Sequence, residues 1–143
     1  KEEQKRSSLL VVIPAYNEEK NIHMVIETAV KLSEYDYLII NDGSTDRTLN
    51  VCRKAGYNIL DLPVNLGLAG AFQAGMRYAL QNGYKYAVQF DGDGQHLAEF
   101  IPSMEKCAED KKCNIVIASR YIEGKKGKSL REIGSRLISL SIR

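Results

Sequence analysis

The stretch Leu9-Leu-Val-Val-Ile13, followed by Pro14, decides the fold class of this chain. A short, continuous apolar run of this kind is typical of a strand that is buried on both faces of a parallel sheet. The next segment, Glu18 to Leu32, carries apolar side chains at a helical spacing. Together the two segments predict a β-strand followed by an α-helix that covers the sheet.

The same alternation continues along the chain. We expect further strands at residues 37–40, 57–62, 86–90 and 115–118. Helices are expected at 46–55 and 98–110, and a third should begin at the glycine-containing segment 65–70 and run to about Asn82. Asp46 or a neighbouring hydroxyl should cap the second helix, and Gly83 should end the third. Because parallel strands need crossover connections, this pattern predicts an α/β fold with a doubly wound, mainly parallel sheet and helices on both faces.

Composition limits the class of protein. With 143 residues and 44% hydrophobic content, the chain can bury one core, so we expect residues 1–143 to form part of a single domain. The cysteines, three in number and without a CxxC pair, fit neither a disulfide framework nor a zinc ribbon. A net charge of +2 gives no reason to expect nucleic acid as a partner. We see neither a secretory signal at the start nor an apolar run of roughly 18 residues, and therefore expect a cytoplasmic domain.

The C-terminal segment 129–143 is predicted to be a basic amphipathic helix. Its apolar side is formed by Leu130, Ile133, Leu137, Ile138 and Leu140. Arginines and lysines outnumber acids from Lys125 onward, where Glu132 is the one carboxylate. Such a helix can lie on an anionic membrane surface or pack its apolar side onto the sheet, and both alternatives remain open.

Acidic residues follow the predicted strands, at the sheet edge where open α/β folds bind ligands. Asp91 and Asp93 lie two positions apart on a glycine-containing loop and, with Gln95, can offer oxygen ligands to Mg²⁺ or Mn²⁺. The alternative is a simple turn, because Asp and Gly are favoured turn residues. A calcium loop of the EF-hand type is excluded, since His96 and Pro102 occupy its required Gly and Glu positions. Neither a dinucleotide-binding glycine motif nor a P-loop is present.

Five motifs resemble those of family 2 glycosyltransferases and occur in the same order. They are Ile13-Pro-Ala-Tyr-Asn-Glu-Glu19, Ile40-Asn-Asp-Gly-Ser-Thr-Asp46, Asn65-Leu-Gly-Leu, Phe90-Asp-Gly-Asp-Gly-Gln-His96 and Ser119-Arg-Tyr121. The chain is most similar to the dolichyl-phosphate mannose or glucose synthases and their bacterial polyprenyl-phosphate relatives, over residues 9–136. The resemblance implies a GT-A fold whose nucleotide-sugar-binding half is present here and whose acceptor half is cut short.

The resemblance also implies roles for individual residues. Pro14, Tyr16 and Glu18 would line the base and ribose, Ile40 and Asp42 would contact the base, and Gly92 would lie close to the ribose. Asp91, Asp93 and Gln95 would hold the metal, Arg120 would bind diphosphate or acceptor phosphate, and Arg131 and Arg136 would add further phosphate contacts. Asp93 and Arg120 are the candidate catalytic residues. The structural alternatives are a strand terminator for Pro14, a helix-end charge for Glu18, a side-chain-bonded turn for Asp42 and a surface ion pair for Arg120.

The implied reaction is transfer of a hexose, with inversion, from a GDP- or UDP-sugar to a polyprenyl phosphate. A lipid phosphate is already an anion, whereas a sugar hydroxyl acceptor would need a carboxylate base. The basic tail favours the lipid acceptor and peripheral contact with the cytoplasmic face of a membrane. A family 2 enzyme with a glycan acceptor and a non-catalytic nucleotide-sugar-binding module are the alternatives. A sugar nucleotidyltransferase is disfavoured, because no Arg- and Lys-containing glycine loop follows the first strand.

Overall fold

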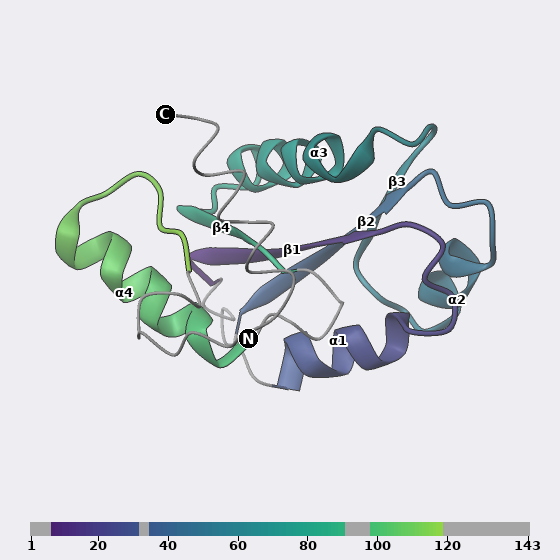
Figure 1. Cartoon of the computed structure of the whole chain (residues 1–143), viewed down its shortest axis with the longest axis horizontal. Helices are drawn as coiled ribbons and strands as arrows, with labels where there is room; N and C mark the ends of the chain where they lie inside the picture. Colours follow the sequence, from purple (N-terminus) through teal and green to yellow (C-terminus); the bar gives the residue numbers. More distant parts are fainter. Residues whose placement is uncertain (1–6, 32–34, 91–97, 119–143) are drawn as a thin grey trace, which may run out of the picture.

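The computed structural model describes residues 7–31, 35–90 and 98–118, and shows alternating strands and helices (Figure 1). In chain order the elements are β1 (Leu9–Ala15), α1 (Ile22–Lys31), β2 (Asp36–Asp42), α2 (Thr48–Lys54), β3 (Ile59–Leu62), α3 (Gly67–Gln81), β4 (Tyr86–Gln89), the short 3₁₀ helix η1 (Ala98–Phe100) and α4 (Ile101–Lys111). The predicted order of elements is confirmed up to α4, with helix and strand ends shifted by a few residues.

The strands form one parallel sheet in the order β3-β2-β1-β4. β1 is central: Val12 is in register with Leu38 of β2 on one side and with Gln89 of β4 on the other. This position explains its unbroken apolar sequence, because residues 9–13 are covered on both faces and are at most 3% exposed. The strand order reverses between β1 and β4, which is the kind of place where open α/β sheets bind ligands.

Two apolar layers sandwich the sheet. Along β1, Val11 and Ile13 pack with α1, α2 and the start of α4, whereas Leu10 and Val12 pack with α3. Figure 1 shows this arrangement, with α3 on one face of the sheet and α1 and α4 on the other. The prediction of a doubly wound sheet with helices on both faces is therefore confirmed.

Helix α3 lies close against β1 because one of its buried residues has no side chain. A Cβ atom at Gly75 would overlap the side chain of Val12. At its end, Gly83 adopts a positive φ of 77°, and the amide of Tyr84 donates to the carbonyl of Ala79 at 3.0 Å. This is the glycine-terminated helix end that the sequence predicts.

Pro14 lies inside β1 and does not close it, since the strand continues to Ala15. The amide of Phe90 donates to the Val12 carbonyl, so the backbone of Val12, and by alternation that of Pro14, faces the β4 side. Pairing with β4 ends at Val12–Gln89. The next bond of a parallel ladder would run from the amide of residue 14 to the carbonyl of Phe90, and Pro14 has no N–H to donate, which accounts for the end of the pairing here.

The strand predicted at residues 115–118 is wrong. This run joins no sheet in the described part of the chain, and Ile115 and Ile117 are 77% and 80% exposed. A short apolar run forms a strand only where a neighbouring strand pairs with it, and local sequence does not supply that partner. The helix predicted at 129–143 lies outside the described residues. Among the helices that are described, none has the length and apolar character needed to cross a bilayer.

Candidate functional site

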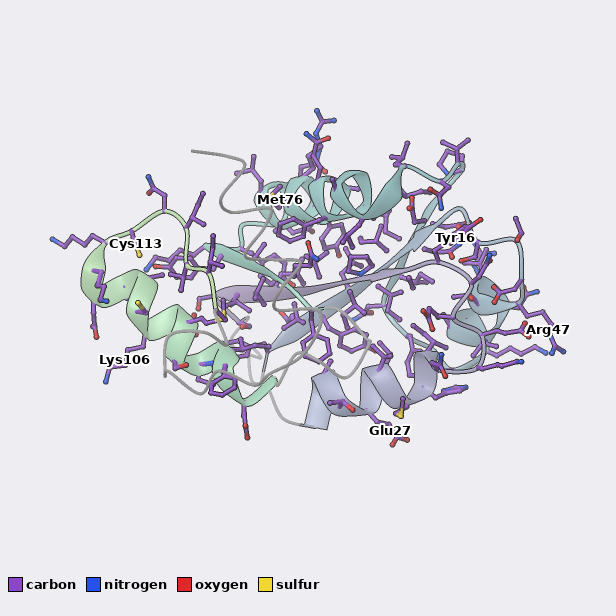
Figure 2. The ribbon with its side chains drawn as sticks, viewed as in Figure 1. Tyr16, Glu27, Arg47, Met76, Lys106 and Cys113 are labelled. Carbon is purple, nitrogen blue, oxygen red and sulfur yellow. The ribbon has the colours of Figure 1, made fainter. Side chains whose placement is uncertain are left out.

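The carboxyl ends of β1 and β2 lie side by side and form the candidate site. Ala15 is in register with Asn41, so the loops that leave these two strands start at the same edge of the sheet. Tyr16, labelled in Figure 2, follows Ala15 and is 47% exposed, whereas Asp42 follows Asn41 and is 3% exposed. The site therefore combines an accessible aromatic ring from the first loop with a buried carboxylate at the start of the second.

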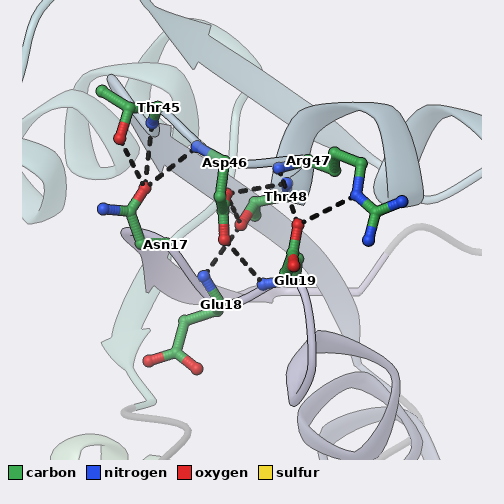
Figure 3. Close-up of polar contacts among 7 residues, drawn as sticks. All are labelled: Asn17, Glu18, Glu19, Thr45, Asp46, Arg47 and Thr48. Carbon is green, nitrogen blue, oxygen red and sulfur yellow. Dashed lines mark hydrogen bonds and ion pairs between the residues drawn. The ribbon is translucent and has the colours of Figure 1, made fainter.

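Asn17 joins the first loop to the second (Figure 3). Its side-chain Oδ1 accepts hydrogen bonds from the backbone amides of Thr45 at 2.9 Å and Asp46 at 3.3 Å. Its own amide donates to Oγ of Ser44 at 3.0 Å. Asn17 has a positive φ of 56°, a conformation that Asn adopts more readily than most residues. One residue thus supplies both the turn after β1 and the bonds to the loop after β2.

Asp46 and Thr48 contact the backbone of the first loop in return. The hydroxyl of Thr48 accepts the amide of Glu18 at 2.8 Å and donates to Oδ1 of Asp46 at 2.6 Å. The two oxygens of Asp46 also accept the amides of Thr48 at 2.9 Å and Glu19 at 3.2 Å. Burial raises the pKa of Asp46, but the hydrogen bonds from Thr48 and Glu19 outweigh it and hold the pKa below its ordinary value. Asp46 is thus ionised when it holds both loops.

The predicted cap of the second helix is partly correct. Arg47 precedes α2 and forms no side-chain cap, while Asp46, one residue earlier, bonds the amide of Thr48. Glu19 adds an outer contact, since its carboxylate accepts the amide of Arg47 at 3.0 Å and Nε of Arg47 at 3.2 Å. The bond from the Arg47 amide, with smaller help from its side chain, lowers the pKa of Glu19. The Arg47 side chain is 80% exposed, so this ion pair contributes little to stability.

Glu18 contacts the start of α1 through both its backbone and its side chain. Its carbonyl accepts the amides of Asn21 and Ile22, and its carboxylate accepts Nδ2 of Asn21 at 3.0 Å. In Figure 3 the carboxylate extends away from the contacts between the loops. The helix-end alternative for Glu18 thus describes an interaction that is present, and a role in ribose binding stays a prediction.

Asp42 ties the end of β2 to the start of α3. One of its oxygens accepts the amide of Leu66 at 2.7 Å. The following residue, Gly43, has a φ of 64°, and a Cβ atom there would lie 2.6 Å from backbone atoms of Val64 and Asn65. The loop after β2 is therefore held on one side by the loop after β1 and on the other by the segment before α3.

Asn41 is a polar residue of this edge that the sequence patterns did not single out. It is 1% exposed, and its Nδ2 donates to Oδ1 of Asp61 in β3 at 2.6 Å. Arg53 lies 3.6 Å from the other oxygen of Asp61. Among the residues that the structure describes, no donor bonds the Oδ1 atom of Asn41. A buried acceptor without a donor is unusual, and it leaves one unsatisfied oxygen below the candidate site.

Of the predicted site residues, Pro14, Tyr16, Glu18, Ile40 and Asp42 lie at this edge of the sheet. Ile40 is fully buried in the layer beneath α3, and its contact with a base stays a prediction. The other predicted site residues, Asp91, Gly92, Asp93, Gln95, Arg120, Arg131 and Arg136, lie outside the described residues.

The metal site stays a prediction for the same reason. Within residues 7–31, 35–90 and 98–118, no group of three or more His, Cys, Asp or Glu side chains is placed to hold a metal ion. The residues predicted to do so all lie at 91–95. Asn17 and Thr48 are site residues without a predicted contact, because their partners are about 30 residues away along the chain, roughly the length of one strand-helix-strand unit.

The model of the family described as "Glycosyl transferase family 2" matches residues 10–138. The chain belongs to glycosyltransferase family 2. The resemblance drawn from its motifs is therefore confirmed, and the match includes the edge formed by β1 and β2. It extends beyond α4 into residues that the structure does not describe.

Two curated relatives of this family 2 chain are named for lipid-phosphate acceptors. The undecaprenyl-phosphate mannosyltransferase of Micrococcus luteus is 30% identical over 124 residues, covering 82% of this chain and 50% of the relative. The polyprenol monophosphomannose synthase of Mycolicibacterium smegmatis is 30% identical over 122 residues, covering 80% and 46%. The chain thus spans about half the length of the curated relatives it matches.

A solved structure with a similar fold holds a nucleotide and a metal. Glucosyl-3-phosphoglycerate synthase from Mycobacterium tuberculosis, in complex with Mn²⁺, uridine diphosphate and glucosyl-3-phosphoglycerate, is 26% identical with a TM-score of 0.54. The similarity covers 71% of this chain and 39% of that one. The GT-A-like fold predicted from the sequence is therefore confirmed.

Proposed function

We propose that this family 2 chain is the donor-binding part of a glycosyltransferase that moves a hexose from a nucleoside-diphosphate sugar to a polyprenyl phosphate. The observation that carries the proposal is the joined edge of β1 and β2, where Tyr16 is exposed beside buried Asp42. The ring of Tyr16 offers an apolar face to a base or ribose. The second oxygen of Asp42 offers an acceptor for a base N–H.

A nucleoside diphosphate is the ligand class that suits this edge. Mn²⁺ and uridine diphosphate occur together in the similar synthase structure, which supports a nucleotide donor for this chain. Asp91, Asp93 and Gln95 offer oxygen atoms only, the donor set that Mg²⁺ and Mn²⁺ prefer. A cation bound to them would neutralise the diphosphate as it leaves. Arg120 offers a guanidinium that can bind two phosphate oxygens at once.

The names of the two curated relatives support a lipid-phosphate acceptor. Such an acceptor is an anion near neutral pH, so it can attack the anomeric carbon without a protein base. In-line attack on that carbon inverts its configuration. The basic residues of 125–143 would favour contact with an anionic, cytoplasmic membrane surface. Transfer to a sugar hydroxyl is the second candidate, and it would require an additional carboxylate base.

The donor proposal is tested by titrating the chain with UDP-glucose and GDP-mannose in a calorimeter, with and without MnCl₂. We expect saturable binding of one donor that is tighter with Mn²⁺. ADP-glucose serves as a control for nonspecific binding of sugar nucleotides. If neither donor bound in the presence of Mn²⁺, the proposed function would be wrong for this chain.

The acceptor proposal is tested with whichever sugar nucleotide binds, radiolabelled in its hexose. Undecaprenyl phosphate in phosphatidylcholine vesicles is compared with a soluble disaccharide of the same hexose. We expect label to enter the lipid fraction. Label in the disaccharide alone would favour the second candidate.

A further inference from the structure

The loops that leave β1 and β2 hold each other through hydrogen bonds from side chains of each loop to the backbone of the other. Asn17 of the first loop bonds the amides of Thr45 and Asp46. In return, Asp46 and Thr48 bond the amides of Glu19 and Glu18. We call Asn17, Asp46 and Thr48 the clasp. Figure 3 shows that its contacts run in both directions between the two loops.

We propose that Asn17, Asp46 and Thr48 are positioning residues, which hold the nucleotide-binding edge in its binding-competent shape before the ligand arrives. This inference rests on the proposed function, because it assigns the clasp to the same edge. The clasp is distinct from the residues predicted to touch the nucleotide, and it acts through them.

Burial supports an indirect role. Thr48 is 0% exposed, so its hydroxyl cannot reach a ligand, and its two hydrogen bonds go to Glu18 and Asp46. Asn17 directs its Oδ1 toward the backbone of Thr45 and Asp46. The side chains of the clasp are therefore engaged within the protein, whereas the neighbouring ring of Tyr16 is exposed.

The position of the clasp explains what it controls. It begins at the residue after Tyr16 and ends at the first residue of α2. Asp42 is the last residue of β2, and Gly43 lies between β2 and that helix. Binding that must order a loop is weaker than binding to a loop already in place. Loss of the clasp should therefore weaken nucleotide binding even though no contact with the nucleotide is removed.

Paired substitutions separate the clasp from general stability. Thr48→Val removes the hydroxyl at nearly constant volume, and Thr48→Ser keeps it. Asn17→Gly removes the carboxamide and tolerates the positive φ of 56°, whereas Asn17→Asp keeps an acceptor at the same place. Because Asn17 is exposed, its pair remains informative if Thr48→Val does not fold. Ala79→Gly, in the last turn of α3 at the opposite edge of the sheet, is a control that destabilises the fold elsewhere.

The measurement is the dissociation constant for UDP or GDP, whichever the wild-type chain binds, with MnCl₂ and at a temperature where circular dichroism shows every variant folded. We expect Thr48→Val and Asn17→Gly to bind about five- to tenfold more weakly, as the loss of one or two hydrogen bonds implies. Thr48→Ser and Asn17→Asp should stay within about twofold of wild type, and so should Ala79→Gly.

Two results would overturn the proposal while leaving the proposed function intact. In one, Thr48→Val and Asn17→Gly are less stable but bind the nucleotide as wild type does. In the other, Ala79→Gly weakens binding as much as they do, so that the effect follows stability alone. A wild-type chain that binds neither UDP nor GDP would overturn both this inference and the proposed function.

Discussion

The carboxylate of Asp42 accepts a 2.7 Å hydrogen bond from the backbone amide of Leu66, 24 residues further along the chain. This bond joins the end of β2 to the start of α3, the helix that packs on the face of the sheet opposite α1. It occupies one of the two carboxylate oxygens of Asp42, a residue that is 3% exposed. Asp42 therefore has a structural role in addition to the base contact proposed for it, and substitutions can separate the two.

Asp42→Ala should destabilise the fold by about 1–3 kcal/mol, because it leaves the Leu66 amide without its acceptor. Asp42→Asn keeps an oxygen for that amide and should cost less, but it replaces the second acceptor with an NH₂ group. We therefore expect Asp42→Asn to remain near wild-type stability in urea while it binds the nucleotide more weakly. Unchanged nucleotide affinity in Asp42→Asn would contradict the proposed base contact.

Gly43→Ala should destabilise the fold more than Gly56→Ala. Both glycines have a positive φ, 64° and 71°, so both substitutions carry a backbone cost of about 1–2 kcal/mol. At Gly56 a new Cβ atom meets nothing within 4 Å, whereas at Gly43 it meets backbone atoms of Val64 and Asn65 at 2.6 Å. Overpacking adds about 1–3 kcal/mol. Urea denaturation of the two variants measures the difference, and equal stability would show that the segment before α3 moves away freely.

Gly75→Ala should also be destabilising, and Val12→Ala should relieve part of the effect. The added methyl group improves helix propensity by about 1 kcal/mol but overlaps the Val12 side chain, an overpacking cost of about 1–3 kcal/mol. Val12→Ala makes room for it. A double-mutant cycle in urea should give a favourable coupling between the two substitutions. Simple additivity would show that α3 shifts away from the sheet at little cost.

Asp93→Ala should abolish the Mn²⁺-dependent part of the thermal shift produced by the nucleotide donor. Removal of one of two carboxylates weakens a site built from oxygen ligands, and ligand stabilisation scales with concentration over dissociation constant. Glu99→Ala, an exposed acid beyond the predicted metal loop, is the matched control. If the Mn²⁺-dependent shift survived in Asp93→Ala, the cation would have to bind elsewhere.

Asp46 should make the fold sensitive to acid. Its pKa is lower in the folded than in the unfolded chain, so the ionised carboxylate stabilises the fold above the unfolded value of about 3.9. That contribution is lost as the pH falls through the folded-state pKa. Asp46→Asn should therefore be about 1–2 kcal/mol less stable than wild type at neutral pH, and the difference should shrink below about pH 4. A constant difference from pH 7 to pH 3, measured by urea denaturation, would assign the effect to packing.

The amino-acid sequence alone predicts the parallel α/β fold and the family. The run Leu9–Ile13 predicted a strand buried on both faces of a parallel sheet, and that prediction is confirmed, because a strand covered on both faces needs apolar side chains throughout. Gly83 marked the end of α3, since a positive φ there favours glycine. The motifs at 13–19 and 40–46 placed polar residues at strand ends, which parallel strands bring to one edge. Signals of this kind are local and can be read from neighbouring residues.

Which of those polar groups face each other could be learned from the folded chain but not from the sequence. The bonds of Asn17 to Thr45 and of Thr48 to Glu18 join residues 28 and 30 positions apart, and the Asp42–Leu66 bond depends on where α3 begins. The apolar run 115–118 shows that a strand cannot be predicted from local sequence alone, because its sequence favours a strand but Ile115 and Ile117 are exposed. Hydrogen bonding and pairing depend on partners that are distant in the chain, and only the folded arrangement of the strands brings those partners together.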